Sequence, residues 1–141
     1  MIRLKNVSMS YDGDKPALVD VTLSVAKGEF VFVVGPSGSG KSSLIRLLLR
    51  EVLPTKGEIY VAGLDVKRLR KWKVPLLRRN IGCVFQDFKL LPNKTAFENV
   101  AFALEVIGRP RRVINQVVPE VLSLVGLEDK LNSYPDELSG G

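Results

Sequence analysis

The sequence has 141 residues, 45% of them hydrophobic and 26% charged, which is the composition of an ordinary globular domain with its own core. Within these residues, the lack of histidine excludes histidine catalysis and histidine metal sites, and the single cysteine excludes an intrachain disulfide. The net charge of +6 fits nucleic acid, an anionic membrane surface or an anionic small molecule, so charge alone does not select the ligand.

The chain is expected to work in a reducing, cytosolic setting. No apolar run in these residues reaches the ~18 residues that a membrane span needs. The first residues, MIRLKNVSMSY, lack the long apolar core of a signal peptide. Cys83 stands in the apolar run IGCVF, where we expect a buried, reduced thiol.

The first 25 residues are expected to form antiparallel strands. Ile2, Leu4 and Val7 indicate a first strand. Apolar residues then alternate with polar ones, the period of a half-buried strand, at Val19, Val21, Leu23 and Val25. The Asp-Gly pair within the segment 11–16 is a hairpin signal.

A strand, a glycine-rich loop and a helix are expected next. The run FVFVV at 30–34 is typical of a strand covered on both faces, as in a parallel α/β sheet. After the loop, KSSLIRLLLREVL predicts a helix with a broad apolar face, which Pro54 ends.

The loop between them matches G-x-x-x-x-G-K-[ST] without a mismatch, the Walker A pattern, at Gly35, Pro36, Ser37, Gly38, Ser39, Gly40, Lys41 and Ser42. Glycines let the backbone wrap around phosphate, and successive N–H groups with the helix N-terminus make an anion nest. Lys41 is expected to bridge the β- and γ-phosphates, Ser42 to ligate Mg²⁺, and Ser43 to add a phosphate contact. A plain glycine-rich turn is the alternative, and many NTPases share the motif.

Further elements follow along the chain. Segments 57–62 and 81–85 are predicted strands. Thr95 and Glu98 are spaced as a capping box for a helix to about Ile107. A helical pattern over 112–125 contains Pro119, so two short helices are expected there, with the proline in a first turn.

The stretch 67–79 contains seven basic residues and no acidic residue. The favoured interpretation is a solvated connector, because most runs of charged residues lie in solvent. Contact with anionic lipid headgroups or an acidic partner is the functional alternative. Trp72 within it is expected to be a packing residue rather than an interface residue.

Several motifs in this order resemble those of the ABC ATPases. Tyr11 resembles the aromatic that stacks on adenine, 35–42 the Walker A loop, Gln86 the Q-loop glutamine, and Leu138–Gly141 the start of the LSGGQ signature. Within the family, segments 74–82 and 84–106 resemble the bacterial cell-division branch. Lipoprotein-releasing and macrolide-export ATPases are near relatives and the alternative.

The resemblance implies an α/β P-loop NTPase fold. It comprises a RecA-like ABC ATPase core with an N-terminal antiparallel β-subdomain, and a helical subdomain. The implied division places the nucleotide-binding core at 1–85 and the Q-loop and helical subdomain at 86–141. The C-terminal part of the core is absent from these residues.

The resemblance also implies roles for individual residues. Tyr11 would stack on the base of ATP, Lys41 and Gln86 would be catalytic, and Ser42 and Gln86 would hold Mg²⁺. In a homodimer, the signature residues would cap the γ-phosphate of the opposite subunit: Ser139, Gly140 and Gly141. The region after Gln86 would dock a membrane-protein partner, which places the subunit peripherally at the cytoplasmic face of the bacterial inner membrane.

The family's Walker B carboxylates and switch histidine come after LSGGQ, outside this sequence. We therefore expect these 141 residues to bind MgATP but to hydrolyse it weakly or not at all. Open sheet edges are expected to favour self-association. A P-loop kinase or GTPase lacks support because no N-K-x-D motif follows. A nucleic-acid module is not expected, because Trp72 is the only aromatic in the basic stretch.

Overall fold

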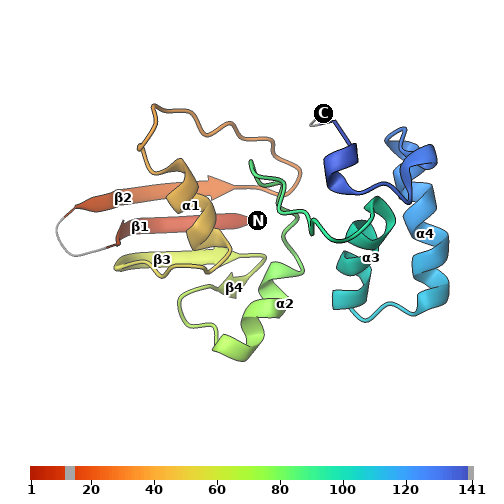
Figure 1. Cartoon of the computed structure of the whole chain (residues 1–141). Helices are drawn as coiled ribbons and strands as arrows, with labels where there is room; N and C mark the ends of the chain where they lie inside the picture. The colour runs from red at the N-terminus through yellow and green to blue at the C-terminus, as the bar shows by residue number, and fades with distance from the viewer. Residues whose placement is uncertain (12–14, 140–141) are drawn as a thin grey trace. The chain divides into compact units, whose positions relative to one another are not determined.

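A computed structural model describes residues 1–11 and 15–139, which divide into two compact units (Figure 1). The first unit is Met1–Gly82 and the second is Cys83–Gly141.

The first unit is built on a four-stranded antiparallel sheet in the order β2-β1-β3-β4. Its strands are β1 (Ile2–Ser10), β2 (Pro16–Val25), β3 (Lys56–Val61) and β4 (Leu64–Asp65). Leu4 pairs with Leu23 of β2 and with Ile59 of β3, so these apolar side chains lie in one row. The predicted antiparallel start is confirmed, and the strand predicted at 57–62 is confirmed as β3. The Asp-Gly turn itself lies outside the described residues.

A paired irregularity bends β1 and β2. Asn6 and Asp20 both have left-handed backbones, with φ of 48° and 49°, and the Asn6 Nδ2 donates to Asp20 Oδ1 at 2.8 Å. Asn and Asp are the non-glycine residues that tolerate this conformation best. The register shifts there, so Leu18 is buried and Val19, expected in the inward-facing set, is exposed.

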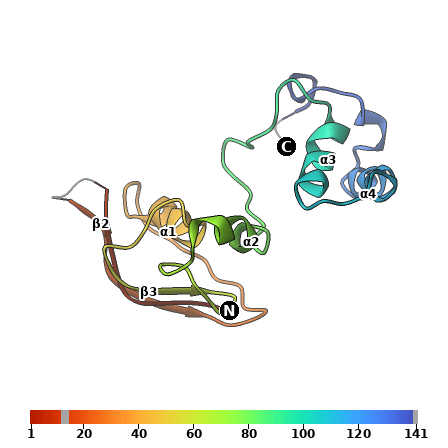
Figure 2. The same cartoon turned by 90° about the horizontal axis from the view of Figure 1, so that it is seen from below.

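Helices α1 (Lys41–Leu48) and α2 (Val74–Arg78) lie on the same side of this sheet (Figure 2). Leu44, Leu47 and Leu77 bring them into one core with the sheet residues Leu4, Val7, Met9, Leu18, Ile59 and Val61. The 3₁₀ turn η1 (Lys71–Lys73) leads directly into α2. Two arginines join the end of α1 to the segments that follow β3. Arg50 donates to the carbonyls of Val66 and Leu69, and Arg78 of α2 donates to the carbonyl of Leu49 at the end of α1.

Two predicted strands are not formed. Segments 30–34 and 81–85 have no strand assignment, and Phe30 and Val34 are 80% and 85% exposed. A strand requires hydrogen bonds to a neighbour, and no described strand pairs with either segment. Cys83 is accordingly exposed, so the expectation of a buried thiol is wrong.

The second unit is helical. Its elements are α3 (Ala96–Val106), α4 (Arg111–Leu124) and the 3₁₀ turns η2 (Glu128–Lys130) and η3 (Pro135–Glu137). Its core consists of Ala101, Ile114, Val118 and Leu122. The predicted capping box is confirmed: the Glu98 amide donates to Thr95 Oγ1 at 3.2 Å, and the Thr95 amide donates to the Glu98 carboxylate at 2.9 Å.

The expected break at Pro119 does not occur, because α4 is one helix with the proline inside it. A proline removes one helical hydrogen bond, here the bond to the Asn115 carbonyl, which lies on an exposed residue. Ile114, Val118 and Leu122 are buried on both sides of the proline. Burial of this continuous face outweighs the lost bond and keeps the helix in one piece.

Candidate functional site: a phosphate-binding loop

The glycine-rich loop ends at the N-terminus of α1. Gly40 precedes the helix with φ 92°, and the first helical bond runs from the Leu44 N–H to the Gly40 carbonyl at 2.9 Å. The amides of Lys41, Ser42 and Ser43 thus have no acceptor within the helix. Together with the helix dipole, they make the loop end of α1 electropositive.

Gly40 is also the point where the loop touches the sheet. A Cβ at this position would lie 2.6 Å from the Ala17 carbonyl oxygen and 2.7 Å from Leu18 Cδ2. Glycine is therefore required twice, by the backbone angle and by the close approach to β2. Gly38 shares a positive φ of 80°, but a Cβ there would meet nothing within 4 Å.

The Lys41 side chain folds back over the loop. Its Nζ donates to the carbonyls of Gly35 and Pro36, at 2.7 Å each, and lies 3.3 Å from Ser39 Oγ. The ammonium is thereby held against the loop that precedes α1. This donor set of one ammonium and several amides suits a polyphosphate and offers nothing to a cation.

Tyr11 lies next to the same helix. Its hydroxyl is 3.1 Å from the Oγ of Ser43, a buried residue, and Arg46 Nη1 donates to the phenol oxygen at 3.5 Å. The hydrogen bond to Ser43 and the bond and charge of Arg46 lower the pKa of Tyr11. Tyr11 is 47% exposed, and the Arg46 guanidinium carbon lies 6.0 Å from the centre of its ring. Ser37 and Ser42 are exposed beside the loop.

Gln86 belongs to the second unit, where it is exposed in a turn. The following residues Phe88 and Lys89 both have φ of 54°, and Lys89 pairs with Asp87. Farther along, Asn99 holds the loop before α3: its Oδ1 accepts from the Leu91 amide at 2.8 Å, and its Nδ2 donates to the carbonyls of Leu91, Lys94 and Thr95.

Ser139 follows a segment that is tied to the start of α3. The Ala96 amide donates to the Ser133 carbonyl at 2.8 Å, and the Phe97 amide to that of Leu131 at 3.0 Å. These bonds occupy two of the amides that a helix N-terminus leaves without partners. Ser139 is exposed. Gly140 and Gly141, predicted with it, lie outside the described residues.

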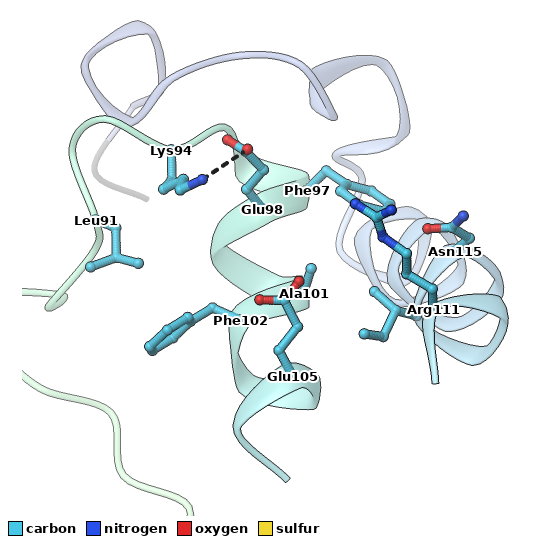
Figure 3. Close-up of a pocket in the computed structure, with 10 residues that line it drawn as sticks. Leu91, Lys94, Phe97, Glu98, Ala101, Phe102, Glu105, Arg111 and Asn115 are labelled. Carbon is cyan, nitrogen blue, oxygen red and sulfur yellow. Dashed lines mark hydrogen bonds and ion pairs between the residues drawn. The ribbon is translucent and has the colours of Figure 1, made fainter. Parts of the chain in front are cut away.

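A cavity of about 350 Å³ opens on the second unit along α3 (Figure 3). Its apolar wall includes Leu91, Phe97 and Phe102. Charged side chains stand around these, namely the ion pair of Lys94 with Glu98 at 3.1 Å, together with Glu105 and Arg111. The mixture of aromatic wall and charged rim is typical of a protein-docking groove.

Two residues of these sites were missed from the sequence. Arg46, which contacts Tyr11, looks like an ordinary exposed helix residue. Asn99 carried a weak signal, because an asparagine in the first turns of a helix can bond back to the preceding loop. The sequence alone does not show which residues Arg46 and Asn99 contact.

The glycine-rich loop runs directly into the N-terminus of α1, and residues 18–141 match the model of the ABC transporter family. The chain belongs to this family of ATP-binding domains.

Among curated proteins, the chain is 56% identical to the cell division ATP-binding protein FtsE of Mycobacterium tuberculosis, and 51% identical to that of Bacillus subtilis. Both alignments cover 100% of the chain and 62% of the relative. The methionine import ATP-binding protein MetN of Carboxydothermus hydrogenoformans is 48% identical over 100% of the chain and 42% of its own length. The chain therefore spans about three-fifths of the FtsE relatives it matches.

The solved structures agree on the fold. The dimeric, post-hydrolysis ATP-binding cassette MJ0796, bound to ADP and Pi, matches with a TM-score of 0.88 and 36% identity, covering 99% of this chain and 64% of that one. The predicted fold class is thereby confirmed: an ABC ATPase fold with an antiparallel β-subdomain and a helical subdomain. In the described part of the chain, no helix is long and apolar enough to cross a membrane.

Proposed function

We propose that this chain binds MgATP at the loop 35–42 and forms the nucleotide-binding part of an ABC-type ATPase that acts in bacterial cell division. The observation that carries the proposal is the set of amides at the start of α1 that have no acceptor within the helix, together with the Lys41 ammonium, which bonds to the carbonyls of the same loop. Similarity to FtsE proteins over the whole chain supports the cell-division role.

Each loop residue has a distinct task in this proposal. The amides of 38–43 receive the β-phosphate, and Lys41 exchanges its carbonyl partners for β- and γ-phosphate oxygens, which accept stronger, charge-assisted bonds. Ser42 supplies a hydroxyl to Mg²⁺, which takes its other ligands from phosphate and water. Ser43 reaches the phosphates only after its bond with Tyr11 opens, which frees the ring to stack on adenine.

Hydrolysis belongs to the whole protein in this proposal. Phosphoryl transfer to water depends on positioning and charge stabilisation, which Lys41 and Gln86 supply. Two subunits enclose the nucleotides, and Ser139, Gly140 and Gly141 of each reach the γ-phosphate bound by the other. The 141 residues alone turn over ATP weakly or not at all in this proposal, because the Walker B carboxylates, which by family resemblance would polarise water, follow the signature segment.

The cavity along α3 supports docking of a membrane-protein partner, FtsX-like by resemblance. It adjoins the loop that follows Gln86, and Asn99 fixes that loop to the cavity wall. An apolar wall formed by Leu91 and Phe102, with charges around it, suits an amphipathic helix of the partner. Such docking holds the subunit at the cytoplasmic face of the inner membrane.

Nucleotide binding tests the proposal directly. The wild type is expected to bind ATP in the presence of Mg²⁺, and Lys41→Ala to lose that binding while keeping its circular dichroism spectrum. Lys27→Ala, an exposed lysine before the loop, is the matched control and should bind normally. Equal binding by Lys41→Ala would contradict the phosphate role, and strong preference for GTP over ATP would contradict the adenine role.

Similarity to MetN proteins favours a second candidate, the ATP-binding subunit of an importer. Lipoprotein-releasing and macrolide-export complexes are further ABC systems with the same loop. Co-purification of the full-length protein with its membrane partner separates these candidates: a cell-division partner supports the first proposal, and a substrate-translocating permease contradicts it.

A further inference from the structure

We propose that a surface on η1 and α2 binds anionic lipid headgroups directly, so that the chain contacts the membrane itself as well as through a partner. This surface, the Trp72 surface, consists of Arg70, Lys71, Trp72, Lys73 and Leu76. It belongs to the first unit and lies outside the phosphate-binding loop.

The Trp72 surface is apolar at its centre. Trp72 is 65% exposed and Leu76 is 48% exposed, whereas the expectation from the sequence was a packed tryptophan. The two residues are four apart along the continuous turn formed by η1 and α2, so they lie on the same face. Val74 and Leu77 are buried, and Leu77 anchors this turn in the core of the first unit.

Basic side chains surround this apolar pair. Arg70, Lys71 and Lys73 are exposed, and the Lys73 ammonium lies 5.0 Å from the centre of the Trp72 ring. Among residues 1–11 and 15–139, none of these three forms an ion pair. Their charge is therefore available to a ligand.

Neighbouring basic residues have other tasks. Arg68 lies 3.6 Å from the Asp65 carboxylate, which also accepts from the amides of Lys67 and Arg68. Arg78 donates to the carbonyl of Leu49 at the end of α1. The basic stretch thus contains arginines with partners and, beside them, the exposed Trp72 surface, for which a solvated connector is the alternative to lipid binding.

The combination selects the ligand. A short amphipathic helix with tryptophan on its apolar side and lysine or arginine beside it is typical of segments that lie in the membrane interface. Anionic headgroups satisfy the ammonium groups while the ring enters the headgroup region. An acidic peptide would satisfy the charges but leave the Trp72 ring in water, and a nucleic acid would require further aromatics for stacking.

Trp72 is the only tryptophan of the chain, so its fluorescence reports on this surface without any label. Vesicles of phosphatidylcholine and phosphatidylglycerol in equal parts should shift its emission to the blue and carry the protein down on sedimentation. High salt should release the protein, because the screening length falls to about 3 Å at 1 M. Vesicles of phosphatidylcholine alone should do neither.

Charge variants assign the binding to this surface. Lys71→Gln with Lys73→Gln should weaken binding roughly 25-fold, since each basic side chain near an anionic bilayer contributes roughly fivefold. Lys15→Gln with Lys27→Gln removes the same charge elsewhere and should leave binding within about threefold. Lys41→Ala, which should lose MgATP binding, should still bind anionic vesicles like the wild type. The lipid-binding proposal and the nucleotide-binding proposal can therefore be refuted independently.

Three outcomes would overturn the proposal. One is an unchanged emission spectrum with anionic vesicles. Another is equal binding to neutral vesicles, which would point to the exposed apolar segment 30–34 instead. A third is a blue shift with soluble polyglutamate as large as that with vesicles, which would identify an acidic protein as the partner.

Discussion

Substitution of Gly40 by alanine tests the contact between the loop and β2. The new methyl group would lie 2.6 Å from the Ala17 carbonyl oxygen, a backbone atom that cannot rotate away, and 2.7 Å from Leu18 Cδ2. The left-handed backbone, φ 92°, adds a cost of about 1–2 kcal/mol for any residue with a Cβ. Overpacking against the sheet adds about 1–3 kcal/mol. The free energy of unfolding should therefore fall by about 2–5 kcal/mol.

Gly38→Ala is the matched control, because it has a similar φ of 80° and no atom within 4 Å of the added Cβ. Only the backbone cost of about 1–2 kcal/mol applies to it. The loss of unfolded-chain entropy is common to both variants and cancels in the comparison. Urea denaturation, followed by circular dichroism and by Trp72 fluorescence, measures the difference. Equal destabilisation by the two variants would refute the claim that the loop rests on β2.

Three further predictions concern the second unit. Thr95→Ala should lower the free energy of unfolding, measured by urea denaturation, by about 1 kcal/mol, because it removes the N-cap hydrogen bond of α3. Thr95→Ser keeps the hydroxyl and should retain the wild-type stability, so equal losses in the two variants would contradict the capping role. Hydrogen bonds from the Thr95 amide and from Lys94 lower the pKa of Glu98. The Glu98 carboxylate therefore stabilises the fold fully above the ordinary glutamate pKa of about 4.3, and this stabilisation is lost as the pH falls through the lowered pKa. The free energies of unfolding of wild type and Glu98→Gln, measured as the pH is lowered, should therefore converge at low pH. A difference that stays constant with pH would contradict this role of the Glu98 carboxylate. Asn99→Ala should speed hydrogen exchange of the Leu91 amide at least tenfold, because it removes the acceptor of that N–H. An unchanged exchange rate would show that Asn99 does not hold the loop before α3.

Local signals in the sequence predicted the elements that are stabilised locally. The capping box of Thr95 and Glu98 needs only residues within one turn, and the antiparallel pairing of β1 and β2 needs only a short connection. The loop 35–42 was recognisable because glycine spacing, a lysine and a following helix are all encoded side by side.

The errors fall where an element depends on distant partners. The segment 30–34 has the composition of a buried strand, yet it pairs with no strand among the described residues and its side chains are exposed. The exposure of Val19 follows from the irregularity at Asn6 and Asp20, two residues whose hydrogen bond joins separate strands. The continuity of α4 through Pro119 results from packing of its buried face, which helix propensity does not describe.

The direct test of the account is the response of individual backbone amides to MgATP, measured by nuclear magnetic resonance. The amides of Gly38, Gly40, Lys41 and Ser42 should shift strongly on addition of MgATP and of pyrophosphate, and should not respond to adenosine. Shifts confined to the Trp72 surface, or a loop that responds equally to adenosine and to pyrophosphate, would contradict phosphate binding at the start of α1.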